Sequence, residues 1–288
     1  MKRPFCEALH VAESVACLLG FLVFGNSPSF AASATPETPA GAPPVRRLGT
    51  NVMESGRLLF FKAPLNAYAR SQLGRLGAAV PFVNAVLALP PGWEAKPRLP
   101  LLVVCSPSGA PAVPGVSGYT NGAFAEGWAV LASDGPPLPA DKDSVMWNWA
   151  TVGSALDYLH QADPNSRAWQ LAVGGFSGGA KRAACVAAAS MESGYEVKGV
   201  FMGGCNEDKA TTGALLYRAG PKFQTTPMFL SNGNQDPIAG PEWGAAVKAS
   251  MERSGFRNTR NGTYAGGHRL DTAQLREALK WFGGPAAR

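Results

Sequence analysis

Histidine, cysteine and clustered charge are all scarce in this sequence. Of its 288 residues, three are histidine and five are cysteine. One histidine and two cysteines lie in the first 17 residues, which leaves two histidines and scattered acidic residues for the rest of the chain. A structural or catalytic metal needs a compact set of such ligands. The sequence therefore predicts no metal site.

Basic residues are numerous but not clustered. The formal net charge is +6, yet no run of lysine and arginine is longer than two. Proteins that bind nucleic acid usually concentrate positive charge in a stripe or patch, so we expect no nucleic-acid partner. The composition, 46% hydrophobic and 16% charged, is that of an ordinary globular protein with a large core.

The apolar run near the N-terminus is too short to cross a membrane. It extends from Val15 to Phe24, ten residues, whereas a spanning helix needs about 20. A basic start at residues 2–3 precedes it, and small residues at 31–34 follow it. These three regions predict a secretory signal peptide over residues 1–31. We therefore expect a secreted or periplasmic protein with no stable membrane anchor.

Residues 32–50 contain four prolines and predict an extended linker. From 51 to 288 we expect one catalytic domain, because short apolar segments alternate with helical patterns and no internal repeat is visible. That alternation predicts an α/β fold with a largely parallel sheet. Strands are expected at 57–64, 81–89, 99–105, 128–133, 169–173, 200–202, 227–231 and 263–264, and helices at 145–159, 180–189, 242–254 and 275–282.

Ser177 lies between an expected strand and an expected helix. Glycines stand at positions 175, 178 and 179, which gives the G-x-S-x-G pattern of a nucleophile elbow. The turn must be tight, so the residues around the serine must be small. The serine hydroxyl would then lie at the edge of the sheet, at the positive end of the following helix. A simple Gly/Ser turn that joins strand to helix is the alternative.

A serine nucleophile needs a base. His10 lies in the expected signal peptide, and His160 lies at the end of the helix that precedes the elbow strand. His268 follows the last expected strand, after two glycines. By elimination, His268 is the expected base.

The base in turn needs an orienting acid. Asp236 lies in a polar loop after the strand at 227–231 and is the expected acid. Asp271 is the alternative, but its position three residues after His268 is more typical of a residue that caps the final helix.

The order Ser177, Asp236, His268 resembles that of the α/β-hydrolase superfamily. The residues that carry the resemblance are 175–179, 233–236 and 267–268. The export signal and short connections are similar to those of compact esterases, a group that includes polyhydroxybutyrate depolymerases and feruloyl or acetylxylan esterases. The resemblance implies an eight-stranded, mostly parallel sheet flanked by helices. It also implies a serine esterase that needs no cofactor.

Two backbone N–H groups are expected to bind the oxyanion. Gly178, directly after the nucleophile, can supply one. The superfamily often has His-Gly after the third strand, but here residues 106–109 read Ser-Pro-Ser-Gly. Pro107 has no N–H, so Ser108 is the expected second donor. A collapsed oxyanion hole would leave a weak or inactive enzyme.

Two further residues are candidates for substrate binding. Trp147 lies opposite the apolar stripe of its helix, where it could be an exposed platform for a sugar ring or an aromatic acid. Packing beneath the loop at 136–143 is the alternative. Lys181, one turn after Ser177, could contact an anionic group or extend into solvent.

The segment from Cys205 to Thr226 is long enough for one helix and its loops, not for a large cap domain. An open site would suit short acyl groups or esters on a polymer, so we expect a small-molecule or polymer-linked ester as substrate. We expect a monomer. A serine peptidase with the same triad is one alternative, and a catalytically silent binding protein on the same scaffold is another. Cys105, Cys185 and Cys205 are expected to be free.

Overall fold

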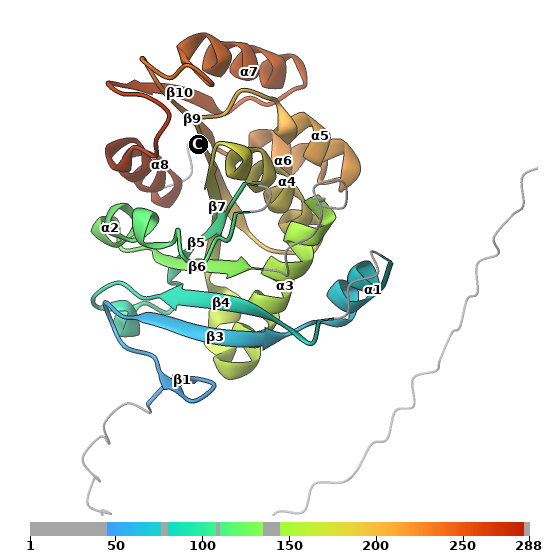
Figure 1. Cartoon of the computed structure of the whole chain (residues 1–288), viewed down its shortest axis with the longest axis vertical. Helices are drawn as coiled ribbons and strands as arrows, with labels where there is room; N and C mark the ends of the chain where they lie inside the picture. Colours follow the sequence, from blue (N-terminus) through green and yellow to red (C-terminus); the bar gives the residue numbers. More distant parts are fainter. Residues whose placement is uncertain (1–44, 76–79, 108–109, 135–144, 285–288) are drawn as a thin grey trace, which may run out of the picture. The chain divides into compact units, whose positions relative to one another are not determined.

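The computed structural model describes residues 45–75, 80–107, 110–134 and 145–284 (Figure 1). The expected signal peptide at 1–31 and residues 32–44 of the expected linker lie outside the described residues. The first described strand begins at Arg47, inside the range expected as linker. No helix within the described ranges is long and apolar enough to cross a membrane.

The strands alternate with helices along the chain, as the sequence predicts. The strands are β1 (Arg47–Leu48), β2 (Asn51–Val52), β3 (Leu58–Pro64), β4 (Phe82–Ala88), β5 (Pro100–Cys105), β6 (Ala129–Asp134), β7 (Gln170–Phe176), β8 (Val197–Gly203), β9 (Met228–Gly233) and β10 (Thr259–Tyr264). The helices are α1 (Ala67–Arg75), η1 (Trp93–Ala95), α2 (Ser117–Ala125), α3 (Val145–Ala162), η2 (Pro164–Ala168), α4 (Gly178–Glu192), α5 (Lys209–Leu216), α6 (Gly220–Thr225), α7 (Pro241–Arg253) and α8 (Thr272–Gly283).

Eight strands form the main sheet, in the order β10-β9-β8-β7-β5-β6-β4-β3 (Figure 1). The pairs β3–β4 and β4–β6 are antiparallel, and all the other pairs are parallel. The short strands β1 and β2 pair with each other in a separate hairpin. The structure therefore confirms the expected eight-stranded, mostly parallel sheet.

The central strand β5 is apolar along its whole length, as is typical of a strand with both faces covered. Residues 101–105 of β5 are all buried. The edge strand β3 instead alternates between exposed and buried residues, as expected for a strand with only one covered face. The burial patterns of β5 and β3 thus reflect a central and an edge position in the sheet.

Each face of the sheet has its own apolar core. Helices α1, α3 and α4 pack on one face, where Leu156 and Leu159 of α3 are fully buried. Helices α2 and α8 pack together on the other face (Figure 1), where Tyr119 of α2 and Leu275 and Phe282 of α8 belong to one buried cluster. The carboxyl ends of β5, β7, β8 and β9 remain available at one edge, as sites in such folds require.

Between β8 and β9 the chain forms two short helices, α5 and α6, where the sequence analysis expected one. They have eight and six residues. Two helices of this size do not make a large cap domain, in agreement with the expected architecture. Leu215 and Leu216 at the end of α5 are exposed.

Candidate active site

Ser177 occupies a strained turn between β7 and α4. Its φ of 57° and ψ of −124° are values that residues with a side chain rarely adopt, and such strain is typical of functional positions. The Ser177 N–H donates to the Gly203 carbonyl at 2.7 Å, and the Ala180 N–H donates to the Ser177 carbonyl at 3.0 Å. The turn is therefore tied both to β8 and to the start of its own helix.

The glycines around Ser177 are sterically required. A Cβ on Gly175 would lie 2.2 Å from the Gly179 carbonyl oxygen, and a Cβ on Gly179 would lie 2.3 Å from the Cys105 carbonyl oxygen. Both contacts are to backbone atoms, which cannot move aside as a flexible side chain can. The G-x-S-x-G pattern thus reflects the close approach of β5, β7 and α4.

The start of α4 provides backbone donors beside the serine. The first N–H groups of a helix have no acceptor within the helix and carry partial positive charge. Pro107 packs against this turn, since its Cβ lies 3.1 Å from where a Gly178 Cβ would be. Arg182 fixes the same segment by donating from Nη1 to the Ser106 carbonyl at 2.9 Å. Ser108, the expected second oxyanion donor, lies outside the described residues.

Asp236 and His268 form a hydrogen-bonded pair. His268 Nδ1 lies 2.7 Å from Asp236 Oδ2. The other oxygen, Oδ1, accepts from the Ile238 N–H at 2.8 Å and from the Ala239 N–H at 2.9 Å. The Asp236 side chain is fully buried, whereas the His268 side chain is 20% exposed. The loops after β9 and β10 thus bring together the two residues that the sequence analysis paired.

The hydrogen bonds decide the charge of Asp236. Burial alone would raise its pKa, but the bonds from Ala239, His268 and Ile238 outweigh burial and hold the pKa below its ordinary value. The carboxylate is therefore ionised at neutral pH and can only accept hydrogen bonds. His268 Nδ1 must then donate the proton of this hydrogen bond, and in the neutral tautomer the lone pair lies on Nε2.

The His268 ring lies against the residue that precedes Ser177. The His268 ring packs on Phe176, the residue before the serine, with ring centroids 4.6 Å apart. A Cβ on Gly204 would lie 3.1 Å from His268 Cε1, the carbon bonded to Nε2. Among the described residues, the Ser177 hydroxyl has no hydrogen-bond partner. Such contacts often tighten only when substrate binds.

Asp271 is the N-cap residue of α8. Its Oδ1 accepts from the Gln274 N–H at 2.9 Å, which caps the start of α8. His160, the other remaining histidine, lies on α3 and bonds through Nδ1 to Ser166 at 2.7 Å. Neither residue takes part in the hydrogen bond between Asp236 and His268.

Two buried side chains that the sequence analysis did not identify hold the loops of the pair. Tyr264 donates its hydroxyl to the carbonyls of Gly267 and Arg269, one on each side of His268. Asn232 donates from Nδ2 to the Cys205 carbonyl at 3.2 Å and to the Ala239 carbonyl at 2.8 Å. Both residues lie near the ends of strands. Their role in holding these loops is visible only in the folded structure, because their hydrogen-bond acceptors lie in other segments or beyond the strand.

Of the two expectations for Trp147, the structure contradicts the exposed platform, and the loop at 136–143 of the other lies outside the described residues. Its side chain is only 6% exposed and belongs to the core on the α3 side of the sheet. Lys181 forms an ion pair with Glu207 at 3.0 Å, so its charge is already matched. Neither arrangement places these residues in contact with the Asp236–His268 pair.

The three cysteines are free and buried. Burial raises the pKa of Cys105 to about 12 and the pKa values of Cys185 and Cys205 to about 11. Such thiols are poor nucleophiles at neutral pH. In the part of the chain that the structure describes, no group of three or more His, Cys, Asp or Glu residues could hold a metal ion.

The sheet order, the elbow after β7 and the chain order Ser-Asp-His together define an α/β-hydrolase fold. The site lies at the carboxyl ends of the parallel strands, where ligands bind in open α/β sheets.

Known structures share this fold. The chain is similar to a bacterial heroin esterase with a TM-score of 0.55 and 17% identity, over 78% of this chain and 83% of that one. It is similar to an esterase of Pyrobaculum calidifontis with a TM-score of 0.54 and 14% identity, over 79% and 83%. A thermostable esterase of Pseudomonas putida gives a TM-score of 0.52 and 14% identity, over 79% and 81%. No family model and no curated protein matches the sequence.

Proposed function

We propose that this protein is a carboxylic-ester hydrolase in which Ser177, His268 and Asp236 form the catalytic triad. The observation that carries the proposal is the buried Asp236–His268 hydrogen bond beside a serine with a strained backbone. The three similar proteins of known structure described above are esterases, which supports an ester as the substrate.

The geometry suggests a two-stage mechanism without a cofactor. Ser177 Oγ attacks the carbonyl carbon of the ester while His268 Nε2 takes the hydroxyl proton. Asp236 stabilises the resulting imidazolium through Nδ1. The Gly178 N–H, and in our proposal the Ser108 N–H, donate to the oxyanion. The C–O bond to the alcohol then breaks, His268 protonates the leaving alkoxide, and the acyl group remains on Ser177.

Water completes the reaction. His268 takes a proton from a water molecule, whose oxygen attacks the acyl-enzyme carbonyl. The second tetrahedral intermediate collapses, the Ser177 oxygen recovers the proton from His268, and the carboxylic acid leaves. The cycle returns every residue to its starting protonation state.

The preferred substrates in this proposal carry a short acyl group or are attached to a polymer. Support comes from the segment between β8 and β9, where α5 and α6 are too small to enclose a long acyl chain. We therefore expect efficient turnover of p-nitrophenyl acetate and butyrate and a steep fall toward the palmitate. Highest activity on the palmitate, with activation when droplets form, would contradict this preference.

The direct test compares wild type with Ser177→Ala on p-nitrophenyl butyrate. The variant should lose activity by about 10⁴-fold or more, because triad residues act as a unit. Equal activity of the two proteins would reject the proposed nucleophile. A matched p-nitroanilide separates esterase from peptidase, since cleavage of the amide as fast as the ester would favour a peptidase.

Export and a monomeric state complete the proposal, and both rest on the sequence. Expression of the full chain in a bacterial host should yield periplasmic protein whose N-terminus lies near residue 32. Retention of residues 1–31 in a cytosolic product would contradict export. Size-exclusion chromatography with light scattering should give the mass of one chain, and the mass of a dimer would contradict the monomer.

A further inference from the structure

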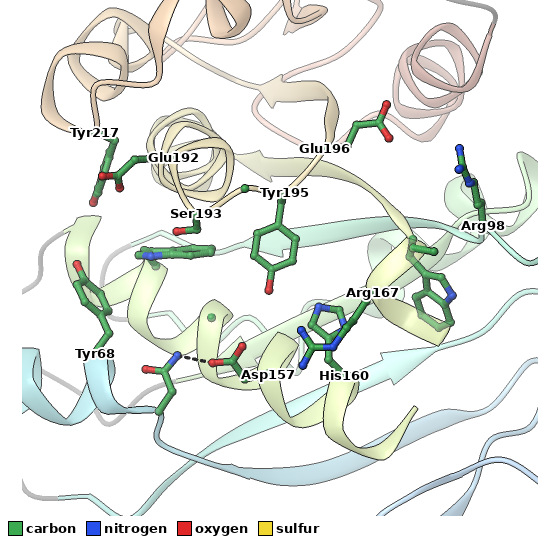
Figure 2. Close-up of a pocket in the computed structure, with 16 residues that line it drawn as sticks. Tyr68, Arg98, Asp157, His160, Arg167, Glu192, Ser193, Tyr195, Glu196 and Tyr217 are labelled. Atoms are coloured by element: carbon green, nitrogen blue, oxygen red, sulfur yellow. Dashed lines mark hydrogen bonds between the residues drawn. The ribbon is translucent and has the colours of Figure 1, made fainter. Parts of the chain in front are cut away.

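A cavity lies far from Ser177. Its volume is about 730 Å³, within the range of small-molecule sites. We call it the α3–α4 cavity, because α3, η2 and the end of α4 form much of its wall (Figure 2). Residues from several other segments complete it, among them Asn66, Tyr68, Arg98 and Tyr217.

The cavity and the active site lie at opposite ends of strand β7 and helix α4. Trp169 lines the cavity just before β7, and Ser177 follows β7. At about 3.3 Å per strand residue, those eight steps (177 − 169) span about 26 Å. Glu192 lines the cavity at the end of α4, fifteen helical steps from Ser177 (192 − 177), or about 22 Å. A ligand in the cavity would therefore not contact the triad.

Aromatic rings supply the apolar part of the cavity wall. Tyr195 stands at its centre (Figure 2), edge-on to Trp149 with ring centroids 6.2 Å apart and stacked with His160 at 5.9 Å. Tyr68 and Tyr217 face each other at one end of the cavity (Figure 2). Rings of this kind offer a flat apolar surface with a polar group at the edge.

His160 presents an unpartnered acceptor. The residue is only 4% exposed. The Ser166 hydroxyl donates to the Asp163 carbonyl at 2.6 Å, so it must accept from His160 Nδ1–H at 2.7 Å. That leaves a lone pair on Nε2, an atom buried without a hydrogen-bond partner. Burial also lowers the pKa of His160, which keeps the ring neutral.

Tyr217 presents a second unpartnered group. The residue is 9% exposed, and its hydroxyl has no hydrogen-bond partner. Buried polar groups in native proteins are nearly always satisfied, so two such groups in one cavity require an explanation. Asp157 adds another acceptor, because Asn66 Nδ2 occupies only its Oδ2, at 2.8 Å. The wall thus combines aromatic rings with unsatisfied polar groups, of which His160 Nε2 and the Tyr217 hydroxyl are covered and become accessible to a ligand when neighbouring side chains of the wall shift.

The wall carries charges of both signs, so a ligand with a single strong charge meets repulsion from one set of them. Three carboxylates, Asp157, Glu192 and Glu196, would repel an anion. Two guanidinium groups, Arg98 and Arg167, would repel a cation. A neutral molecule with many hydroxyl groups avoids both penalties and can donate to His160 Nε2 while its C–H faces lie on the rings.

We propose that the α3–α4 cavity binds a neutral carbohydrate chain, with aromatic rings as platforms and His160 Nε2 and the Tyr217 hydroxyl as specific contacts. This site goes beyond the proposed esterase activity and does not require it. If both proposals hold, the cavity would hold a polysaccharide by a second contact while an ester on the chain or nearby material reaches Ser177.

The test measures binding of cellopentaose, xylopentaose and maltopentaose by calorimetry, with tryptophan fluorescence as a second readout because Trp149 and Trp169 line the cavity. At least one sugar should bind with a Kd of about 1 mM or tighter. His160→Asn can keep the Ser166 contact but removes Nε2, and Tyr217→Phe removes only the hydroxyl. Each change should weaken binding by about 3- to 10-fold.

Tyr158→Phe is the matched control, because it also removes a tyrosine hydroxyl but does not line the cavity. It should bind sugar like wild type, and all three variants should hydrolyse p-nitrophenyl butyrate at the wild-type rate. Ser177→Ala should bind sugar normally, which separates this proposal from the esterase proposal.

Several results would overturn the carbohydrate site. One is the absence of saturable binding of all three sugars up to about 10 mM. Another is binding that neither cavity variant weakens while both keep their folded stability, which would place the sugar elsewhere. Tighter binding of tetramethylammonium or sulfate than of any sugar would identify a site for a charged ligand instead.

Discussion

Replacement of Asp236 by asparagine tests the roles within the proposed triad. Oδ1 of the new side chain can still accept from the Ile238 and Ala239 N–H groups, so the loop should keep its structure. The group facing His268 becomes an amide NH₂, which donates. His268 Nδ1 must then accept this hydrogen bond, and the ring proton moves to Nε2. Protonated Nε2 can no longer take the proton of Ser177.

The expected loss follows from this change of tautomer. Removal of the orienting carboxylate in such a triad lowers kcat by about 10⁴-fold, which corresponds to about 5.4 kcal/mol in the activation free energy. The assay is kcat on p-nitrophenyl butyrate, with circular dichroism and thermal unfolding to show that the variant is folded. Asp271→Asn is the control, and should cost at most about 1 kcal/mol of stability as a weakened helix cap, with near wild-type kcat. The reasoning is refuted if Asp236→Asn stays within about tenfold of wild type, or if Asp271→Asn is the variant that loses activity.

Three further predictions concern the structure around the site. Gly179→Ala should lower the free energy of unfolding, measured by chemical denaturation, by about 1–3 kcal/mol or more, because the new Cβ would meet the Cys105 carbonyl. The control Gly74→Ala has open space at its Cβ and should be neutral or stabilising. Equal stability of the two variants would contradict this. Tyr264→Phe should lower kcat on p-nitrophenyl butyrate by about 3- to 10-fold with little change in KM, because the loop that carries His268 loses the hydrogen bonds from the Tyr264 hydroxyl. A change in KM alone would point to a different role. The pKa of Asp236 is held below its ordinary value of 3.8, so its ionised form stabilises the fold when the pH is above 3.8, and this contribution is lost as the pH falls through the folded-state pKa. The free energy of unfolding should therefore fall less for Asp236→Asn than for wild type between about pH 6 and pH 2. Parallel curves of unfolding free energy against pH would contradict the shift.

The sheet and the candidate triad could be predicted because each leaves a local signal. Strands buried on both faces are continuous apolar runs, as in β5, and the elbow is a pentapeptide whose glycines avoid backbone clashes. With only two histidines left after the expected signal peptide, elimination was enough to assign His268. Asp236 could be chosen over Asp271 because aspartate often caps helix N-termini, as Asp271 does at the start of α8.

Other features depend on packing between distant segments, which the sequence does not display. Helix α2 is rich in glycine and polar residues and has little intrinsic helical preference, so its packing against α8 had to be seen. The sequence left both an exposed and a packed position open for Trp147, because helical periodicity distinguishes two faces of a helix but does not show what covers each face. Tyr264 acts through carbonyls on either side of His268, and the α3–α4 cavity joins segments from residue 66 to residue 217. No short motif marks either arrangement.

Labelling with a fluorophosphonate tests the central claim, that Ser177 is an activated nucleophile. The reagent should modify wild-type protein at one site, and peptide mass mapping should place the modification on Ser177. Ser177→Ala should remain unlabelled, and His268→Gln should react much more slowly, because the serine has lost its base. Failure of the folded wild type to react, or equal labelling of wild type and Ser177→Ala, would contradict the serine mechanism.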